Sequence, residues 1–404
     1  MNIVMLLSAP YPADIRVSKE AQSLIKAGYT VHLLCANNGQ QPARETVEGI
    51  HVHRINGLSK HYQVGIWDVI NAINFIHPLF YLALRKFIKR HPVDVLHVHD
   101  LPLAKTAMLL GGKHAIPVVL DLHENFPEAL SVWFEWKKNP LIRLKNKLFF
   151  SYSRWEKYER YAVRRSDQVV AVVEEMKQRL VKKYAVNTDK ITVVTNAEYK
   201  NFKEQTVVPD IYQTDEKIFT VTYTGNVGPH RGVDTVIEGM QYLKDLPIRF
   251  AIVGRTNAAV QRKLEALIEQ YDLHEQVKLY GYQPFHTFFS FMSQADANII
   301  PHHSNPHTDN TIPHKIFQCM QVKRPLVVSS SAPIRRIVEE TSSGVVFEAG
   351  NPRDLARVLR RLYEDQELRE RLAQNGYLAT QNGTYNWEHT EQALLTLYGQ
   401  FSNP

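Results

Sequence analysis

Short runs of consecutive apolar residues recur along the chain and alternate with longer, helix-patterned segments. In the first half they are NIVMLLS, YTVHLLCA, VDVLHVHD (93–100), PVVLDLHE (117–124), QVVAVV (168–173) and ITVVTN (191–196). In the second half they are FTVTYTG (219–225), FAIVG (250–254), VKLYG (277–281), ANIIP (297–301), PLVVSS (325–330) and GVVFEAG (344–350). Continuous apolar runs are typical of parallel strands that helices bury on both faces. The pattern predicts an α/β protein.

A polar stretch at about 197–216 separates the two series of runs and has the composition of a linker. A chain of 404 residues is long enough for two or three domains. We therefore predict two doubly wound, Rossmann-like domains, at 1–200 and 215–384. Such sheets bind ligands beyond the carboxyl ends of their strands, so the motifs that follow strands are the candidate site.

Charge and cysteine content narrow the class of protein further. Lys and Arg number 48 against 41 Asp and Glu, a formal charge of +7, which suggests a phosphate-rich partner, an anionic membrane or nucleic acid. Two cysteines, Cys35 and Cys319, exclude a disulfide framework and fit a reducing compartment. No run reaches the roughly 18 apolar residues of a membrane span, and the N-terminal apolar stretch lacks the preceding basic residues of a signal peptide. We expect a cytoplasmic protein that touches a membrane.

Basic and aromatic residues are concentrated in two segments of the first half. Residues 137–165 hold ten Lys or Arg and two Glu, and aromatic residues are interleaved throughout 133–165. Residues 75–90 repeat the theme, with an apolar run followed by four basic residues. Basic amphipathic helices bind anionic membranes, so we predict that both segments contact one. The alternative is ordinary surface helices whose aromatic side chains face the core. Nucleic acid is not expected, because no recognition motif accompanies the charge.

Two motifs of the first half follow strands and carry residues suited to binding. Arg16, in SAPYPADIRVSKEA, lies near a predicted helix start, where it would either bind an anion or pair with Asp14 or Glu20. His123, in DLHENFPEA, follows a buried-type strand and is flanked by acidic residues, so it is a candidate partner for a sugar or phosphate. A purely structural histidine is the alternative.

Histidines also end the neighbouring strand. His97 and His99, together with His123, raise the question of a metal site. No carboxylate spacing typical of a metalloenzyme accompanies them, so we predict no metal.

In the second half, YTGNVGPHRG places a glycine-containing turn between a strand and a helix. Glycine allows backbone N–H groups to approach an anion closely, and Arg231 adds a guanidinium fork for phosphate oxygens. The motif predicts a phosphate site.

The segment 305–330, NPHTDNTIPHKIFQCMQVKRPLVVSS, predicts a helix start. Asn310 or Thr311 would be the cap and the following proline would lie in the first turn. Lys315 then falls near the helix N-terminus, where a cation is unfavourable unless an anion is bound. Gln318 lies eight residues after Asn310 and thus on a nearby helix face. The segment predicts donors for a diphosphate and a polar side chain for ribose, against the alternative of a merely capped helix.

Taken in order, these motifs resemble glycosyltransferase family 4, the nucleotide-sugar-dependent, retaining enzymes with the GT-B fold. The resemblance spans nearly the whole chain. It implies two Rossmann-like domains facing across a cleft, a donor held mainly by the second domain and no obligatory cofactor. It also implies that a final helix, at about 385–404, packs back on the first domain.

The resemblance also implies roles for individual residues. Arg231 corresponds to the basic residue that grips the donor diphosphate, and His123 to the histidine that faces the donor sugar. Tyr282 lies where backbone atoms contact the base. Ile312 and His314 would offer backbone N–H groups to sugar or phosphate.

The chain departs from the family pattern at three positions. The two glutamates that seven residues separate in the family are Asn310 and Gln318 here. An additional basic residue of the family is Asn226 here, so Lys315 would supply the missing charge. We predict a bacterial hexosyltransferase on the inner face of the cytoplasmic membrane. It would move a sugar from a UDP- or GDP-linked donor to a hydroxyl of a lipid-linked or oligosaccharide acceptor in cell-envelope polysaccharide synthesis. The amide replacements keep a non-catalytic partner subunit open, and a sugar-nucleotide epimerase is the other alternative.

Overall fold

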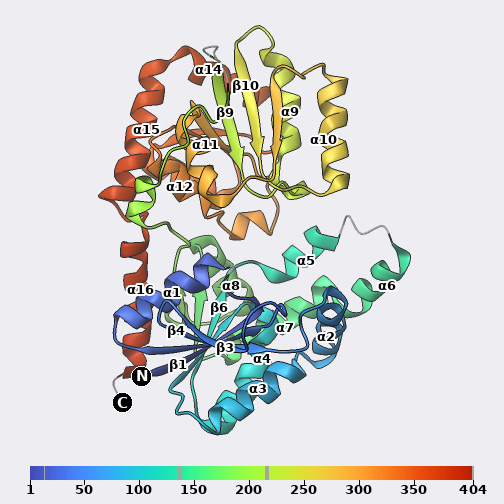
Figure 1. Ribbon diagram of the computed structural model, residues 1–404, viewed down its shortest axis with the longest axis vertical. Coiled ribbons are helices and arrows are strands. Elements are labelled where there is room, and N and C mark those ends of the chain that lie inside the picture. Colours follow the sequence, from blue (N-terminus) through green and yellow to red (C-terminus); the bar gives the residue numbers. More distant parts are fainter. Residues whose placement is uncertain (13, 135–138, 214–217, 403–404) are drawn as a thin grey trace. The chain divides into compact units, whose positions relative to one another are not determined.

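The computed structural model describes residues 1–12, 14–134, 139–213 and 218–402 (Figure 1). The chain forms two compact units. Unit 1 contains Met1–Thr195 and Glu391–Pro404, and unit 2 contains Asn196–Thr390. Each unit has a sheet with helices on both of its faces, which confirms the predicted α/β class and the pair of Rossmann-like folds.

The sheet of unit 1 has the strand order β3-β4-β2-β1-β5-β6-β7-β8, and every pair is parallel except β3 with β4. Its strands are β1 (Asn2–Pro10), β2 (Thr30–Ala36), β3 (Arg44–Val47), β4 (Ile50–Ile55), β5 (Val95–His99), β6 (Val118–Leu122), β7 (Gln168–Ala171) and β8 (Ile191–Val193). Its helices are α1 (Ile15–Lys26), α2 (His61–Asn74), α3 (Pro78–Ile88), α4 (Ala104–His114), α5 (Phe126–Phe134), α6 (Pro140–Phe149), α7 (Tyr152–Arg165) and α8 (Glu174–Tyr184). The predicted apolar runs form the central strands because both faces of the sheet are covered.

The sheet of unit 2 is entirely parallel, in the order β11-β10-β9-β12-β13-β14. Its strands are β9 (Phe219–Thr224), β10 (Ile248–Val253), β11 (Val277–Gly281), β12 (Ala297–Ile300), β13 (Leu326–Ser329) and β14 (Gly344–Phe347). Its helices are α9 (Val233–Met240), α10 (Ala258–Gln270), α11 (Phe288–Gln294), α12 (Lys315–Gln321), α13 (Ala332–Thr341), α14 (Pro352–Glu364) and α15 (Gln366–Gln381). The last helix, α16 (Trp387–Ser402), begins in unit 2 and ends in unit 1.

The stretch 197–216 is more than the linker that its composition predicts. A 3-10 helix, η3, occupies Lys200–Glu204, and Glu198 and Phe202 are buried. Tyr212 packs in a core cluster of unit 2 with Val253 and Phe291. Residues 214–217 lie outside the described part of the chain. These anchors could not be recognised from composition, because most residues of the stretch are polar.

The structure supports internal packing for part of the basic, aromatic stretch, and membrane contact stays a prediction. Trp155 is buried and packs against Phe75, Phe126 and Phe150, so most of the aromatic packing is internal. Trp136, with Lys137 and Lys138, lies outside the described residues. The exposed apolar side chains are mainly four aliphatic residues of α6, and Trp133 on α5 and Tyr161 on α7 are also exposed. Among the described residues, none of the helices combines the length and the apolar character needed to cross a membrane.

Candidate active site

A cluster of cations lies at the carboxyl end of β9 in unit 2. The 3-10 helix η4 (Pro229–Arg231) follows the strand and presents Arg231, whose Nη1 donates a hydrogen bond to Nε2 of His302 at 3.0 Å. The next residue, Gly232, has φ +67°, and a Cβ there would lie 1.8 Å from the carbonyl oxygen of Pro301. Only glycine fits this close approach, so the glycine fixes the turn that presents Arg231.

Lys315, the first residue of α12, points back to the same strand end. Its Nζ donates to the carbonyl oxygen of Thr224 at 2.8 Å and lies 3.5 Å from the centroid of the Tyr223 ring. Burial, followed by repulsion from Arg231, lowers the pKa of Lys315 well below its ordinary value. Two cations held this close together favour a bound anion, as the sequence predicted for this position.

The histidines around Arg231 and Lys315 are neutral and add no charge to the cluster. Burial and the charges of Arg231 and Lys315 lower the pKa of His302 well below its ordinary value, so its neutral ring accepts the Arg231 hydrogen bond. Burial, followed by Arg231, lowers the pKa of His230 to about 3. The nearby carboxylate of Asp234 is already paired, at 2.6 Å with Lys263 and 3.1 Å with His303.

The predicted helix start at Asn310 and Thr311 is wrong. These residues end a 3-10 turn, η7 (Thr308–Asn310), and the α-helix begins only at Lys315. The amide Nδ2 of Asn310 donates to the carbonyl of Pro306, and the Thr311 hydroxyl donates to that of His307. Both side chains therefore bond locally inside the loop, as Asn and Thr commonly do. Asn310 and Gln318 do not share a helix, so the argument from their spacing fails.

Gln318 instead contacts a buried carboxylate that the sequence reasoning missed. Its Nε2 donates to Oε2 of Glu198 at 2.8 Å, and Nε2 of His314 lies 3.1 Å from the same oxygen. Glu198 thus supplies a carboxylate beside Gln318, where the family pattern places one of its glutamates. The only signal in the sequence was an acidic residue two positions after the end of the strand-like run ITVVTN.

The remaining predicted positions of unit 2 keep their roles as predictions. Tyr282 follows Gly281 at the end of β11, is 66% exposed, and has the Arg255 guanidinium 5.1 Å from its ring centroid. Ile312 is buried in the loop that precedes α12. An exposed ring at a strand end can stack on a planar base.

In unit 1, Arg16 forms the salt bridge that the sequence left as an alternative. The Asp14 carboxylate caps α1 and accepts from Nε of Arg16 at 3.0 Å and from Nη2 at 2.7 Å. Burial alone would raise the pKa of Asp14, but the hydrogen bond and charge of Arg16 hold it well below its usual range. The guanidinium is therefore fixed in place, and its contact with a ligand remains a prediction.

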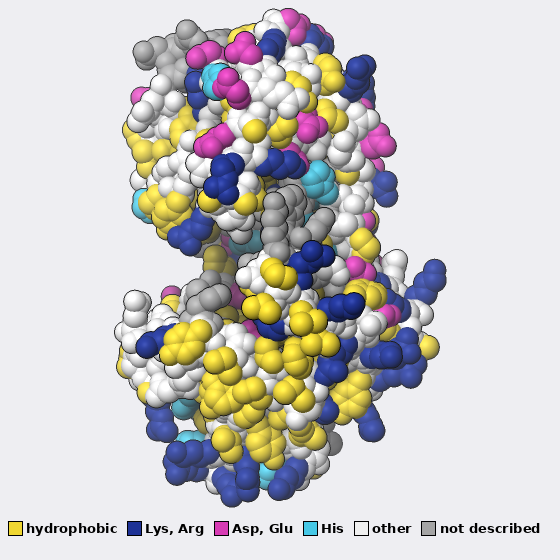
Figure 2. Space-filling model, turned by 90° about the vertical axis from the view of Figure 1, so that its right-hand side faces the viewer, with side chains coloured by type: hydrophobic (Ala, Val, Ile, Leu, Met, Phe, Trp, Pro, Cys, Tyr) yellow, Lys and Arg dark blue, Asp and Glu magenta, His cyan; other side chains and the backbone are white. Residues whose placement is uncertain are grey.

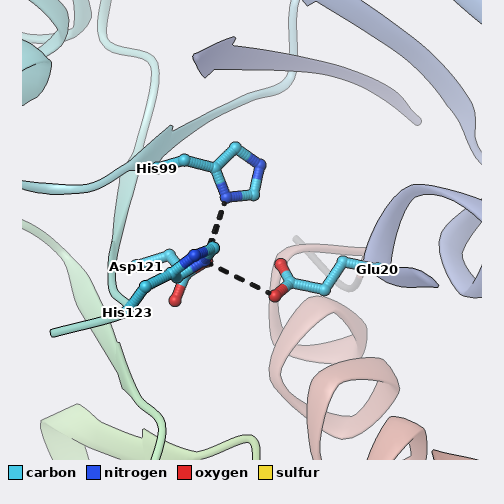
Figure 3. Close-up of side chains that lie close together, drawn as sticks. All are labelled: Glu20, His99, Asp121 and His123. Atoms are coloured by element: carbon cyan, nitrogen blue, oxygen red, sulfur yellow. Dashed lines mark hydrogen bonds and ion pairs between the residues drawn. The ribbon is translucent and has the colours of Figure 1, made fainter. Parts of the chain in front are cut away.

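His123 belongs to a buried cluster built from α1, β5 and β6 (Figure 3). The strand register pairs His99 with Asp121, and Nδ1 of His99 lies 3.0 Å from Oδ2 of Asp121. His123 Nε2 hydrogen-bonds the same oxygen, and Glu20 approaches from α1, with Oε1 3.9 Å from that nitrogen. Nδ1 of His123 has no hydrogen-bond partner among the described residues, which leaves this atom for a ligand.

The cluster keeps His123 charged. Burial and Arg16 oppose the proton, but the Asp121 and Asp100 carboxylates prevail, and the pKa of His123 is raised. Burial and the neighbouring His97 lower the pKa of His99 to about 3. Burial and repulsion from Asp121 raise the pKa of Glu20 well above its ordinary value, so this group is protonated. An imidazolium paired with one buried carboxylate can donate a hydrogen bond to a substrate oxygen.

Four of these side chains also form a possible metal donor set. Glu20, His99, Asp121 and His123 each offer a ligand atom, and these atoms lie within 4.8 Å of one another. Sequence spacing could not reveal the set, because Glu20 comes from a helix about 80 residues before His99. A metal ion would have to displace the proton that His123 and Asp121 share. It would also have to bind close to the positive charge of the Arg16 guanidinium.

Comparisons with known proteins agree with this geometry. Residues 15–197 match the family described as Glycosyltransferase Family 4, and residues 204–379 match Glycosyl transferases group 1. The chain is a group 1 glycosyltransferase of the family 4 type. An uncharacterized glycosyltransferase of Methanocaldococcus jannaschii is 23% identical over 99% of both chains. A putative colanic acid biosynthesis glycosyltransferase of Escherichia coli is 30% identical over 32% of each chain.

Solved structures place this glycosyltransferase in the GT-B fold. HepE of Anabaena, solved in complex with UDP and glucose, superposes with a TM-score of 0.73 at 15% identity, over 99% of this chain and 100% of that one. The family matches show that the protein is a nucleotide-sugar-dependent glycosyltransferase. These matches do not favour the epimerase or the non-catalytic subunit.

One prediction concerns the depressed pKa of Lys315. A nucleoside diphosphate should bind with net proton uptake, because its negative charge restores the proton of this amine. Affinity should therefore fall as the pH rises above the lowered pKa of the free Lys315 amine. Calorimetric titration in two buffers of different ionisation enthalpy measures the uptake. Lys315→Met should abolish it, whereas a pH-independent affinity without proton uptake in the wild type would contradict the assignment.

Proposed function

We propose that this glycosyltransferase is a retaining hexosyltransferase that extends a lipid-linked glycan in bacterial cell-envelope polysaccharide synthesis. Its donor is a UDP- or GDP-linked sugar, and its place is the cytoplasmic face of the membrane. The observation that carries the proposal is the pair of cations, Arg231 and Lys315, at one strand end of unit 2. The nucleotide-bound neighbour and the relative named for colanic acid synthesis support the donor and the pathway class.

The chemistry follows from the charges of the site residues. When the bond between the anomeric carbon and the diphosphate oxygen breaks, negative charge builds on that oxygen. Arg231 and Lys315 stabilise this charge, and such preorganised donors commonly supply the largest part of catalysis. His123, held as an imidazolium by Asp121, orients the sugar or shares the developing charge. The acceptor oxygen then bonds to the anomeric carbon with retention of configuration, and its hydroxyl proton passes to the departing diphosphate oxygen.

The decisive experiment is a transfer assay. Purified protein is incubated with radiolabelled UDP- and GDP-hexoses, with and without a bacterial lipid extract. The proposal expects label in the organic phase that depends on the extract, with only slow donor hydrolysis in its absence. Donor conversion without acceptor would indicate an epimerase, and the absence of nucleotide binding and turnover would indicate a partner subunit.

Membrane contact is supported by the surface of unit 1. Figure 2 shows hydrophobic side chains gathered on one face of this unit, with Lys and Arg along its border. On α6, Leu141, Leu144 and Leu148 are 76%, 56% and 58% exposed. On α3, Leu82 is 59% exposed and the helix ends in exposed basic residues. Exposed aliphatic side chains beside cations suit an anionic bilayer surface.

A flotation experiment tests this contact. The protein should float with vesicles that contain anionic phospholipid, and binding should weaken as salt rises, because surface charges are screened. The double variant Leu141→Ser, Leu144→Ser should lose most of the binding. Leu378→Ser removes an exposed leucine of α15 and serves as the control. Equal flotation of the two variants would argue against the assigned surface.

We also propose that catalysis needs no metal. Chelation should leave the transfer rate within about twofold, because Arg231 and Lys315 already supply the charge that a metal ion would bring. Metal analysis of the purified protein is the second measurement. A stoichiometric metal, together with loss of activity on chelation, would instead assign the donor set around Asp121 to an ion.

A further inference from the structure

A cavity of unit 1 lies beside the exposed leucines of α6. Its volume is about 530 Å³, and its lining comes from the C-terminal end of α2, the start of α4 and helices α6 and α7. We call it the headgroup pocket. Helix α4 begins shortly after the C-terminal end of β5, and His123 directly follows the C-terminal end of β6. Because β5 and β6 are parallel neighbours, the pocket lies at the same edge of the sheet as His123. It is therefore placed to hold a part of the acceptor.

The lining of the headgroup pocket carries three cations, Lys105, Arg154 and Lys157, and none of its residues, all of them described, is acidic. Lys105 Nζ donates to the carbonyl of Asn74 at 2.8 Å, and Arg154 Nη2 donates to that of Ile73 at 2.6 Å. These bonds satisfy carbonyls at the end of α2 but do not neutralise either charge. Lys157 is exposed at the mouth. A net positive pocket without a carboxylate favours an anionic ligand.

Hydroxyl groups complete the polar lining. Tyr158 is buried, its ring stacks on Phe75 at a centroid distance of 3.9 Å, and its hydroxyl accepts from the backbone N–H of Lys105 at 2.8 Å. Burial raises the pKa of Tyr158, so the hydroxyl keeps its hydrogen and can donate it to a ligand. Ser151 and Ser153 also line the pocket. Cations together with hydroxyl donors match the oxygens of a phosphate group.

The outer wall is apolar and continues onto the exposed face of α6. Leu148 lines the pocket and is 58% exposed, and Leu141 and Leu144 lie on the same side of the helix, at spacings of seven and four residues. A ligand with a phosphate in the pocket could therefore place hydrocarbon over these leucines. Behind the pocket, Phe75 contacts Trp155, which contacts Phe126, three residues after His123.

We propose that the headgroup pocket binds the phosphate or diphosphate of a membrane lipid, namely the lipid that carries the acceptor glycan. This assignment rests on the proposed lipid-linked acceptor and adds the residues that would recognise it. It differs from general membrane attraction, because a pocket selects a headgroup that concentrates up to two negative charges, as a diphosphate or a phosphomonoester does, whereas a basic surface responds only to the charge density of the bilayer.

Vesicle binding at matched charge tests the proposal. Phosphatidylcholine vesicles are doped with phosphatidic acid, a phosphomonoester, or with phosphatidylglycerol, a phosphodiester, to the same zeta potential. The wild type should bind the phosphatidic acid vesicles about tenfold more tightly, the effect of one charge-assisted hydrogen bond. Lys157→Ala should abolish this preference. Lys113→Ala removes an equal charge from an exposed site at the other end of α4 and should preserve it.

A soluble probe separates a lipid phosphate from a free one. Inorganic diphosphate is titrated into Arg231→Ala protein, in which the donor site is weakened. Adding Leu148→Ser should reduce vesicle binding while leaving diphosphate binding intact, and adding Lys157→Ala should weaken both. Equal binding to the two lipids, or equal effects of Lys157→Ala and Lys113→Ala, overturns the proposal. Diphosphate binding without a lipid preference also overturns it, in favour of a free phosphate ligand. Nucleotide titration of the wild type reports separately on the proposed donor.

Discussion

Replacing Arg231 with alanine should lower the affinity for the donor nucleotide and kcat/KM by roughly 100- to 1,000-fold, the usual effect of removing one preorganised donor from a developing oxyanion. The loss should exceed that of an ordinary surface ion pair, because Nη1 is fixed by His302 and the backbone by Gly232. Lys315 should recover part of its proton affinity once the neighbouring charge is gone. Proton uptake on binding should therefore decrease in the variant.

Calorimetric titration of UDP and GDP into wild type and Arg231→Ala measures this effect and identifies the base. Arg262→Ala, at an exposed position on α10, removes the same charge outside the cluster and is the control. If one nucleotide binds the wild type and binds Arg231→Ala equally well, the diphosphate site lies elsewhere. If neither nucleotide binds the wild type, the donor assignment itself fails.

Replacing His123 with glutamine should lower kcat by about 100- to 10,000-fold, the range for a group that moves or holds a proton in the transition state. The amide keeps a hydrogen bond to Asp121 but carries no charge. Nucleotide affinity should remain unchanged, since Arg231 and Lys315 belong to the other unit. Steady-state kinetics, with thermal unfolding as a check on folding, distinguishes a lost catalytic charge from lost structure. A kcat within threefold of the wild type would remove His123 from the mechanism.

Asp121→Asn tests the same charge through its partner. Without the carboxylate, burial and Arg16 should lower the pKa of His123, so the imidazolium is lost at a lower pH. The descending limb of the pH–rate profile should therefore move towards acid, whereas a purely structural defect would reduce the rate at every pH.

The sequence predicts the sheets well because their central strands are continuous apolar runs that need no knowledge of their partners. The prediction from sequence fails where the structure depends on which partner a side chain hydrogen-bonds. Asn310 and Thr311 satisfy carbonyls of their own loop, so the expected helix starts later, at Lys315. Glu198 looks like part of a polar linker until Gln318 is placed beside it.

The unit 1 cluster shows the same contrast. His123 at a strand end follows from local pattern, but the buried oxygen that holds its proton is recognised only from the register of β5 against β6. Glu20 reaches the cluster because α1 packs there. Trp155 reads as part of a membrane-facing stretch, yet its burial depends on Phe75 and Phe126, which are distant in sequence. Composition predicts the net charge of a helix, but whether an aromatic side chain faces the core or the solvent depends on how the helix packs.

The course of α16 has a consequence for how the protein is made. Tyr398, on this helix, hydrogen-bonds Nδ1 of His97 at 2.7 Å, although the two residues are 301 positions apart in sequence. Leu394 and Leu397 are buried in the same unit. During translation, unit 2 is synthesised before this final piece of unit 1 leaves the ribosome. The nascent chain can therefore fold unit 2 first, while the histidine cluster of unit 1 still lacks the contact with Tyr398. The proposed sugar contact of His123 is complete only after α16 has emerged.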